Sequence, residues 1–223
     1  LDLSGIAKGY AVDRAALALE ALGIERYMVE AGGEIRTRGA NAEGRPWQIA
    51  VERPDAWPQR PHRLVPLQGL SIATSGDYRN WYEQDGRRIH HEIDPATRAP
   101  AAHALASVSV VHTECMAADA WATALFVLGP QRGFALAREQ GLAALFIVRE
   151  AGGTFRDAWG GERLDTATGV FTNEALIGET LRNLREIAPT VYFNVPKGFE
   201  EIANAMEDDA PLRDSLFSRV NMF

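Results

Sequence analysis

The chain has 223 residues, of which 46% are hydrophobic and 24% charged, as is typical of a folded globular protein. Its 23 basic and 30 acidic residues give a formal net charge of −7, which argues against a dedicated nucleic-acid-binding protein. No apolar run reaches the roughly 20 residues that a membrane-spanning helix needs. The single cysteine, Cys115, excludes an intramolecular disulfide framework.

In the first half of the chain, one helix is followed by several strands. Apolar residues at helical spacing predict a helix over 6–22, ended by Gly23. Apolar and β-branched stretches predict strands over 26–31, 47–52 and 67–74. Four prolines predict a loop over 54–66. Asp85-Gly86 predicts the turn of a hairpin over 81–93.

In the second half, strands again alternate with helices. We expect a strand over 105–112, then an Ala-rich helix over 114–128 capped by Thr113, a short helix over 131–140 and a strand over 142–148. This order predicts an α+β fold, with a mostly antiparallel sheet and flanking helices, over residues 1–150. A Gly-rich, loop-like junction over 151–178 and a small α/β segment over 179–223 are expected to follow. Because the chain opens without Met and ends on an apolar string, we also expect a fragment of a longer protein.

Three short motifs carry small or charged residues where a ligand can approach the backbone. Lys8 stands between glycines at a helix start, where amide groups and one cation can meet a phosphate; a solvated surface lysine is the alternative. Gly32-Gly33 follows a strand and permits close backbone approach, or simply a tight turn. Ser75-Gly76 ends an apolar strand, either at a ligand or in a β-turn.

Two further motifs carry ionisable groups. In the sequence HHEIDP, strand alternation places His91 on the side opposite to Glu92 and Asp94, although histidines at a hairpin rim can also lack a role. Asp119 and Thr123 lie one helical turn apart, so that their oxygens face the same way and can bind a hard cation such as Mg²⁺. The alternative for Asp119 is an acidic residue placed near the helix start by the helix dipole.

Five segments, in this order, resemble the ApbE family of FAD:protein FMN transferases: LDLSGIAKGYAVD, EAGGEIRTRG, SIATSGDYRN, HHEIDPATRAPA and ADAWATALFVLG. The resemblance covers about residues 1–150 and corresponds to the C-terminal half of family members, so it implies a partial ApbE-like domain. It also implies Mg²⁺-dependent transfer of FMN from FAD to a Thr or Ser hydroxyl, with release of AMP. The implied acceptor is a flavoprotein subunit of a membrane redox complex.

The resemblance also implies roles for individual residues. The metal ligands would be Asp119, Thr123 and the backbone carbonyl of Ala7. His91, Asp94 and Lys8 would be catalytic, with Lys8 beside the phosphates. The FAD pocket would be lined by Gly32, Gly33, Ser75 and Gly76, together with Lys8. Glu92 departs from the family, which is usually apolar at that position.

Two alternatives to an active transferase stay open at this point. The chain is either a flavin-binding or inert fragment, if truncation removes part of the site, or a relative of acyl-CoA synthetases. The second alternative rests on residues 179–223, which resemble an internal piece of the feruloyl-CoA type. Family members are often periplasmic or anchored by an N-terminal lipid, and the sequence assigns no compartment to this chain.

Overall fold

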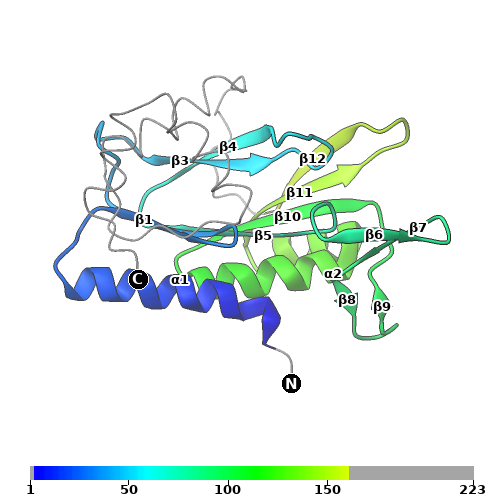
Figure 1. Cartoon of the computed structure of the whole chain (residues 1–223), viewed down its shortest axis with the longest axis horizontal. Helices are drawn as coiled ribbons and strands as arrows, with labels where there is room; N and C mark the ends of the chain where they lie inside the picture. Colours follow the sequence, from blue (N-terminus) through cyan, green and yellow to red (C-terminus); the bar gives the residue numbers. More distant parts are fainter. Residues whose placement is uncertain (1–2, 161–223) are drawn as a thin grey trace.

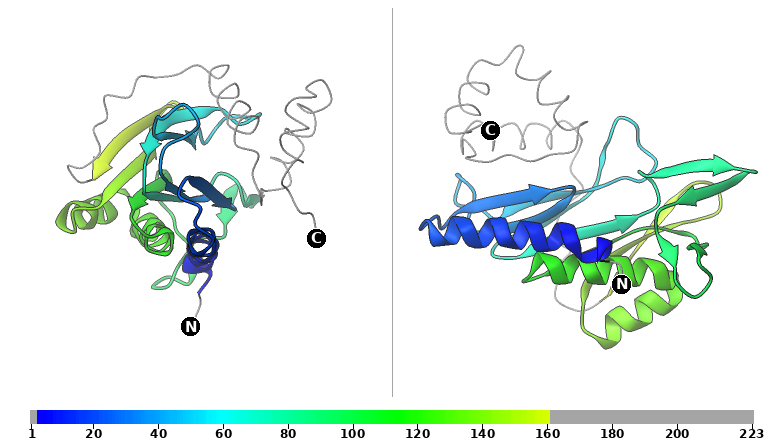
Figure 2. Two further views of the ribbon diagram at one scale, coloured as in Figure 1. Left: turned by 90° about the vertical axis from the view of Figure 1, so that its left-hand side faces the viewer. Right: turned by 60° about the horizontal axis from the view of Figure 1, so that its bottom comes forward.

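A computed structural model of the chain describes residues 3–160, which form a three-layered α+β fold (Figure 1). The middle layer is a six-stranded antiparallel sheet in the order β1-β2-β5-β10-β11-β12. Two long helices, α1 and α2, lie on one face of this sheet, and the β3–β4 hairpin covers part of the other face (Figure 2). The predicted α+β class and the mostly antiparallel sheet are therefore confirmed.

The helices are α1 (Ser4–Ala21) and α2 (Cys115–Glu139). The strands of the main sheet are β1 (Tyr27–Ala31), β2 (Glu34–Arg38), β5 (Ser71–Gly76), β10 (Leu105–His112), β11 (Ala143–Arg149) and β12 (Phe155–Gly160). Three two-stranded pairs complete the described part: β3 (Trp47–Glu52) with β4 (Pro61–Leu67), β6 (Trp81–Gln84) with β7 (Arg87–His90), and β8 (Ile93–Asp94) with β9 (Ala99–Pro100).

Strand β10 is buried on both faces and separates two apolar cores. Val108 and Val110 pack in the core that contains Phe126 of α2. Ala106 and Val111 pack in the second core, which includes Ile49 of the β3–β4 hairpin. The pairing register of β10 with β11 shifts between residues 105 and 107. Side chains before and after this shift therefore do not simply alternate between the two cores.

Three secondary-structure predictions are corrected by the structure. The predicted loop over 54–66 contains most of strand β4. Prolines are tolerated there because Pro61 is the first residue of the strand, and because β4 pairs on one side only, within a two-stranded hairpin. The predicted loop after 151 contains β12, because Phe155–Gly160 pair with β11. Strand β2 was not predicted at all. The predicted break between two helices at 129–130 is confirmed, because α2 has a kink there and Gly129 adopts the non-helical φ of 78°.

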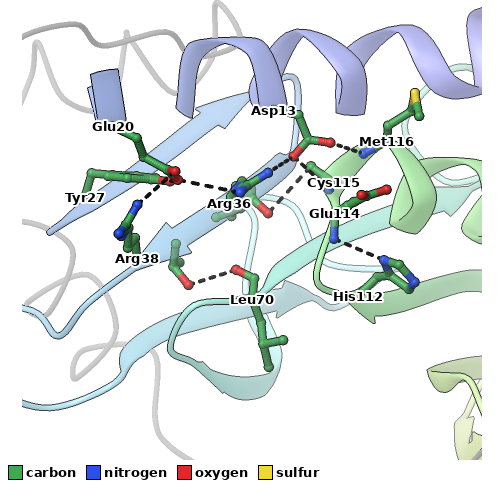
Figure 3. Close-up of polar contacts among 12 residues, drawn as sticks. Asp13, Glu20, Tyr27, Arg36, Arg38, Leu70, His112, Glu114, Cys115 and Met116 are labelled. Carbon is green, nitrogen blue, oxygen red and sulfur yellow. Dashed lines mark hydrogen bonds and ion pairs between the residues drawn. The ribbon is translucent and has the colours of Figure 1, made fainter. Parts of the chain in front are cut away.

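The predicted cap of α2 by Thr113 is wrong, because a residue from another helix satisfies the first amides of α2 (Figure 3). Asp13 of α1 accepts hydrogen bonds from the backbone N–H groups of Cys115, at 3.0 Å, and Met116, at 2.9 Å. The same carboxylate accepts a hydrogen bond of 2.6 Å from Arg36 of β2. Asp13 therefore ties α1, β2 and the start of α2 together.

Other predictions were confirmed or fall outside the described residues. The hairpin turn at Asp85-Gly86 is confirmed, with positive φ at both residues. Within residues 3–160, neither helix is long and apolar enough to cross a membrane. Of the predicted junction over 151–178, only residues 151–160 are described. The predicted α/β segment over 179–223 lies outside the described residues.

Candidate functional site

The candidate site begins where the two helices touch. A Cβ atom on Gly9 of α1 would lie 2.4 Å from the backbone oxygen of Cys115 and 2.7 Å from Cα of Met116, so only glycine fits this contact. The backbone N–H of Gly9 donates a hydrogen bond of 2.9 Å to Oδ2 of Asp119. The close approach of the helices therefore fixes the orientation of a carboxylate that is only 3% exposed.

The predicted pair Asp119 and Thr123 lies between α1 and the end of β5. Thr123 Oγ1 and Ser75 Oγ are 2.9 Å apart, which places a predicted pocket residue against a predicted metal ligand. The first turn of α1 packs on the same threonine, because a Cβ on Gly5 would lie 3.3 Å from Thr123 Oγ1. Ala7 lies on α1 between Gly5 and Gly9, both of which lie close to α2.

Lys8 extends from α1 towards two buried carboxylates. Its Nζ donates to Oε1 of Glu34 and lies 3.9 Å from Oδ1 of Asp119. Glu34 is only 1% exposed, and its second oxygen, Oε2, has no hydrogen-bond partner among residues 3–160. Sequence reasoning missed Glu34 as a site residue, although it directly follows the Gly32-Gly33 motif.

The Gly32-Gly33 turn gives the Lys8 side chain its space. Both glycines have positive φ, at 64° and 97°, which joins β1 to β2 in a two-residue turn. A Cβ on Gly32 would lie 3.1 Å from Cδ of Lys8 and 3.5 Å from Oε2 of Glu34. The turn therefore lies against the Lys8–Glu34 pair.

A third carboxylate, Glu92, faces the same cluster. It is 7% exposed, and Ser75 beside it acts to lower the pKa of its carboxyl against the larger effect of burial. Nε2 of His91 lies 3.6 Å from its Oε1, while about half of the His91 side chain is exposed. The alternation predicted for this segment is confirmed, because Glu92 is buried and His91 is exposed.

Burial dominates the electrostatics of all three carboxylates. Burial raises the pKa of Glu34 to about 7, against the opposing effect of Lys8. Burial also raises the pKa of Asp119, opposed by the Gly9 amide and Lys8, and that of Glu92, opposed by His91. The raised pKa values mean that protons partly neutralise this cluster when no cation is bound. In their ionised forms, the three carboxylates beside one ammonium carry a net charge of −2, which one divalent cation would balance.

The oxygen donors of Asp119 and Thr123 suit a cation whose coordination shell is completed by oxygens of a bound ligand. Within residues 3–160, no three His, Cys, Asp or Glu side chains are grouped to hold a metal by themselves. Mg²⁺ commonly takes only one or two carboxylates from the protein and completes its shell with water and substrate phosphates. Asp119 and Thr123 offer such a partial set, and the uncompensated charge around them favours a cation.

Two predicted site residues also have local structural roles. Oδ1 of Asp94 accepts a hydrogen bond of 2.8 Å from the N–H of Ala96, which forms the turn between β8 and β9. A Cβ on Gly76 would lie 2.8 Å from both the Ala106 oxygen and the Tyr78 ring, so close packing requires glycine there. The site assignments of Asp94 and Gly76 stay predictions.

Comparison with known proteins gives consistent matches over this part of the chain. Residues 1–146 match the ApbE family. The FAD:protein FMN transferase of Klebsiella pneumoniae strain 342 is 46% identical over 153 residues, covering 69% of this chain and 44% of that protein. The protein of the same name from Escherichia coli K12 is 44% identical over 150 residues, covering 67% and 43%. The chain thus spans less than half the length of these relatives.

Two solved structures share the fold. The apo flavinyl transferase ApbE of Pseudomonas stutzeri has a TM-score of 0.66 and 45% identity, covering 76% of this chain and 52% of that one. The flavin transferase ApbE of Vibrio cholerae has a TM-score of 0.64 and 45% identity, covering 72% and 50%. The ApbE match ends at residue 146, so it gives no support to the predicted acyl-CoA-synthetase-like segment over 179–223.

Proposed function

Because the chain belongs to the ApbE family, we propose that residues 1–150 carry the cation and pyrophosphate side of a Mg²⁺-dependent FAD:protein FMN transferase. The observation that supports this most directly is the joining of Lys8, Asp119 and Thr123 at the α1–α2 contact. These groups supply one ammonium and two oxygen donors beside an excess of negative charge, a set suited to a cation–pyrophosphate complex.

The proposed reaction is a phosphoryl-group transfer. A Thr or Ser hydroxyl of the acceptor attacks the phosphorus on the FMN side of FAD, the bond to the AMP phosphate breaks, and the hydroxyl loses its proton. Bound Mg²⁺ would neutralise the pyrophosphate and stabilise the charge that develops on the leaving AMP. The proposed acceptor is a flavoprotein subunit of a membrane redox complex.

Each site residue has a proposed part in this reaction. Asp119, Thr123 and the carbonyl of Ala7 would hold the cation, and Lys8 would face the phosphates. His91, half-exposed at the rim, would accept the hydroxyl proton, and Asp94 would support the turn that follows it. The flavin pocket would be lined by Gly32, Gly33, Ser75 and Gly76.

The first experiment is calorimetric titration of FAD into the 223-residue chain with and without Mg²⁺. The proposal predicts that Mg²⁺ strengthens FAD binding and that Asp119→Asn abolishes this strengthening. Asp85→Asn, at the β6–β7 turn, is the matched control because it removes a carboxylate away from the helix contact. FAD binding that is equal with and without Mg²⁺ would favour a flavin-binding fragment without the proposed cation site.

Activity is tested separately by following AMP release from FAD by chromatography. Mg²⁺-dependent AMP release that is lost in Asp119→Asn would support the transferase chemistry. FAD binding without AMP release, in the presence of an acceptor protein carrying Thr or Ser, would favour the flavin-binding alternative. Absence of both binding and release would favour an inert fragment.

A further inference from the structure

Lys8 and Glu34 form an ion pair whose two members differ greatly in freedom. Glu34 is 1% exposed and lies on β2 within the main sheet, so its position is fixed. The Lys8 side chain is 49% exposed and reaches the carboxylates through a flexible four-carbon stem. Only the ammonium end of this pair has room to move.

The ammonium of Lys8 lies beside the carboxylate expected to hold the cation. Nζ donates to Glu34 Oε1 and is 3.9 Å from Asp119 Oδ1, so one positive charge serves both groups. A divalent cation bound at Asp119 would be repelled by an ammonium at this distance. The ammonium and the cation therefore compete for the same negative charge.

The unpaired oxygen of Glu34 indicates that this arrangement is incomplete. A buried carboxylate oxygen without a hydrogen bond is costly, and Oε2 of Glu34 is such an atom within the described part of the chain. Gly32 leaves the space beside this oxygen and the Lys8 stem free of a side chain. An ammonium that moved away from Asp119 would still have an acceptor here.

We propose that Lys8 is an internal counter-ion for the cation site, and that Glu34 is the positioning residue that holds its ammonium when a divalent cation takes its place beside Asp119. This inference rests on the cation site of the proposed function. It adds that Lys8 opposes cation binding, whereas a lysine that served only to face phosphates would leave cation binding in the absence of FAD unchanged.

The test measures Mn²⁺ binding to the 223-residue chain without FAD, from the loss of the free-ion signal in electron paramagnetic resonance. Lys8→Met should bind Mn²⁺ about tenfold more tightly, because even water-like screening of a nearby charge has an effect of that order. Arg14→Met is the matched control, since it removes one positive charge from an exposed position on the same helix. It should change Mn²⁺ affinity less than twofold.

Glu34→Gln should weaken Mn²⁺ binding about fivefold, because the ammonium loses its charged partner away from Asp119 and one negative charge is removed. Glu25→Gln, at an exposed position, is the corresponding control. If Glu34 acts through Lys8, the effect of Glu34→Gln should be smaller in the Lys8→Met background. Equal effects in both backgrounds would overturn the positioning role of Glu34.

Lys8→Met leaves a buried carboxylate unpaired, so folding of each variant is checked by circular dichroism. If Lys8→Met alone does not fold, the double variant Lys8→Met/Glu34→Gln is compared with Glu34→Gln, and the proposal predicts tighter Mn²⁺ binding in the double variant. Unchanged or weaker Mn²⁺ binding on removal of Lys8 from a folded chain would overturn the counter-ion proposal. If Asp119→Asn binds Mn²⁺ as well as the unmodified chain does, the cation site itself is misplaced and the proposed function fails.

Discussion

Replacing Gly9 by alanine tests whether the helix contact builds the site. The added Cβ would lie 2.4 Å from the backbone oxygen of Cys115, so α1 has to move by about 1 Å to restore an ordinary contact. The atoms it meets belong to the backbone and cannot rotate away. The same movement stretches the 2.9 Å hydrogen bond from the Gly9 N–H to Asp119.

The magnitude follows from two opposing effects. Overpacking costs about 1–3 kcal/mol, and loss of a hydrogen bond to a buried carboxylate costs a further ~1.5–3 kcal/mol. Higher helix propensity of alanine returns about 1 kcal/mol. We therefore expect Gly9→Ala to lower the free energy of unfolding by about 1.5–5 kcal/mol.

Urea unfolding followed by circular dichroism measures this change. Ala18→Gly, at an exposed position of the same helix, isolates the propensity effect and should cost about 1 kcal/mol. Gly9→Ala should in addition weaken Mn²⁺ binding, whereas Ala18→Gly should not. A Gly9→Ala chain as stable as the unmodified one would refute the reasoning from the helix contact.

Three further predictions concern other polar contacts of the fold. Asp13→Ala should cost about 1–2 kcal/mol of unfolding free energy in urea, because the first amides of α2 lose their acceptor; an unchanged midpoint would mean that water replaces the cap without cost. Arg149→Met should cost about 3–5 kcal/mol in the same assay, since Asp77 is 5% exposed and loses its bidentate partner, and Asp77→Leu/Arg149→Met should recover much of this loss. Although burial opposes it, hydrogen bonds from His62 and Arg63 hold the pKa of Asp157 below its ordinary value of 3.8. The contribution of Asp157 to stability is therefore complete above pH 3.8 and is lost as the pH falls through the lowered pKa. Asp157→Asn should accordingly reduce the change of stability with pH in this acidic range, as measured by thermal unfolding.

Local sequence determined most elements of the fold. Periodic apolar residues marked α1 and β10, and Gly23 and Asp85-Gly86 marked a helix end and a hairpin turn, because these signals arise from neighbouring residues. Strands β2 and β12 escaped prediction because each carries charged residues in a short stretch. What makes them strands is pairing with a partner in the sheet.

In the candidate site too, some features follow from neighbouring residues and others from contacts between distant ones. The sequence identified Asp119 and Thr123 as a pair because their spacing of four puts them on one helix face. It gave no sign that Glu34 lies beside Lys8, since 26 residues separate them and a glutamate after two glycines is usually solvated. Nor did it show that Glu92 is buried against Ser75.

The sequence by itself therefore indicated the family, the fold class and the candidate metal ligands Asp119 and Thr123, because these depend on residue identity and short-range order. Only the tertiary structure decided which charges share one buried space. The contact of α1 with α2 at Gly9, and the cap that Asp13 provides, bring together residues more than a hundred positions apart. Electrostatic coupling depends on distance and burial, and packing of the whole domain sets both.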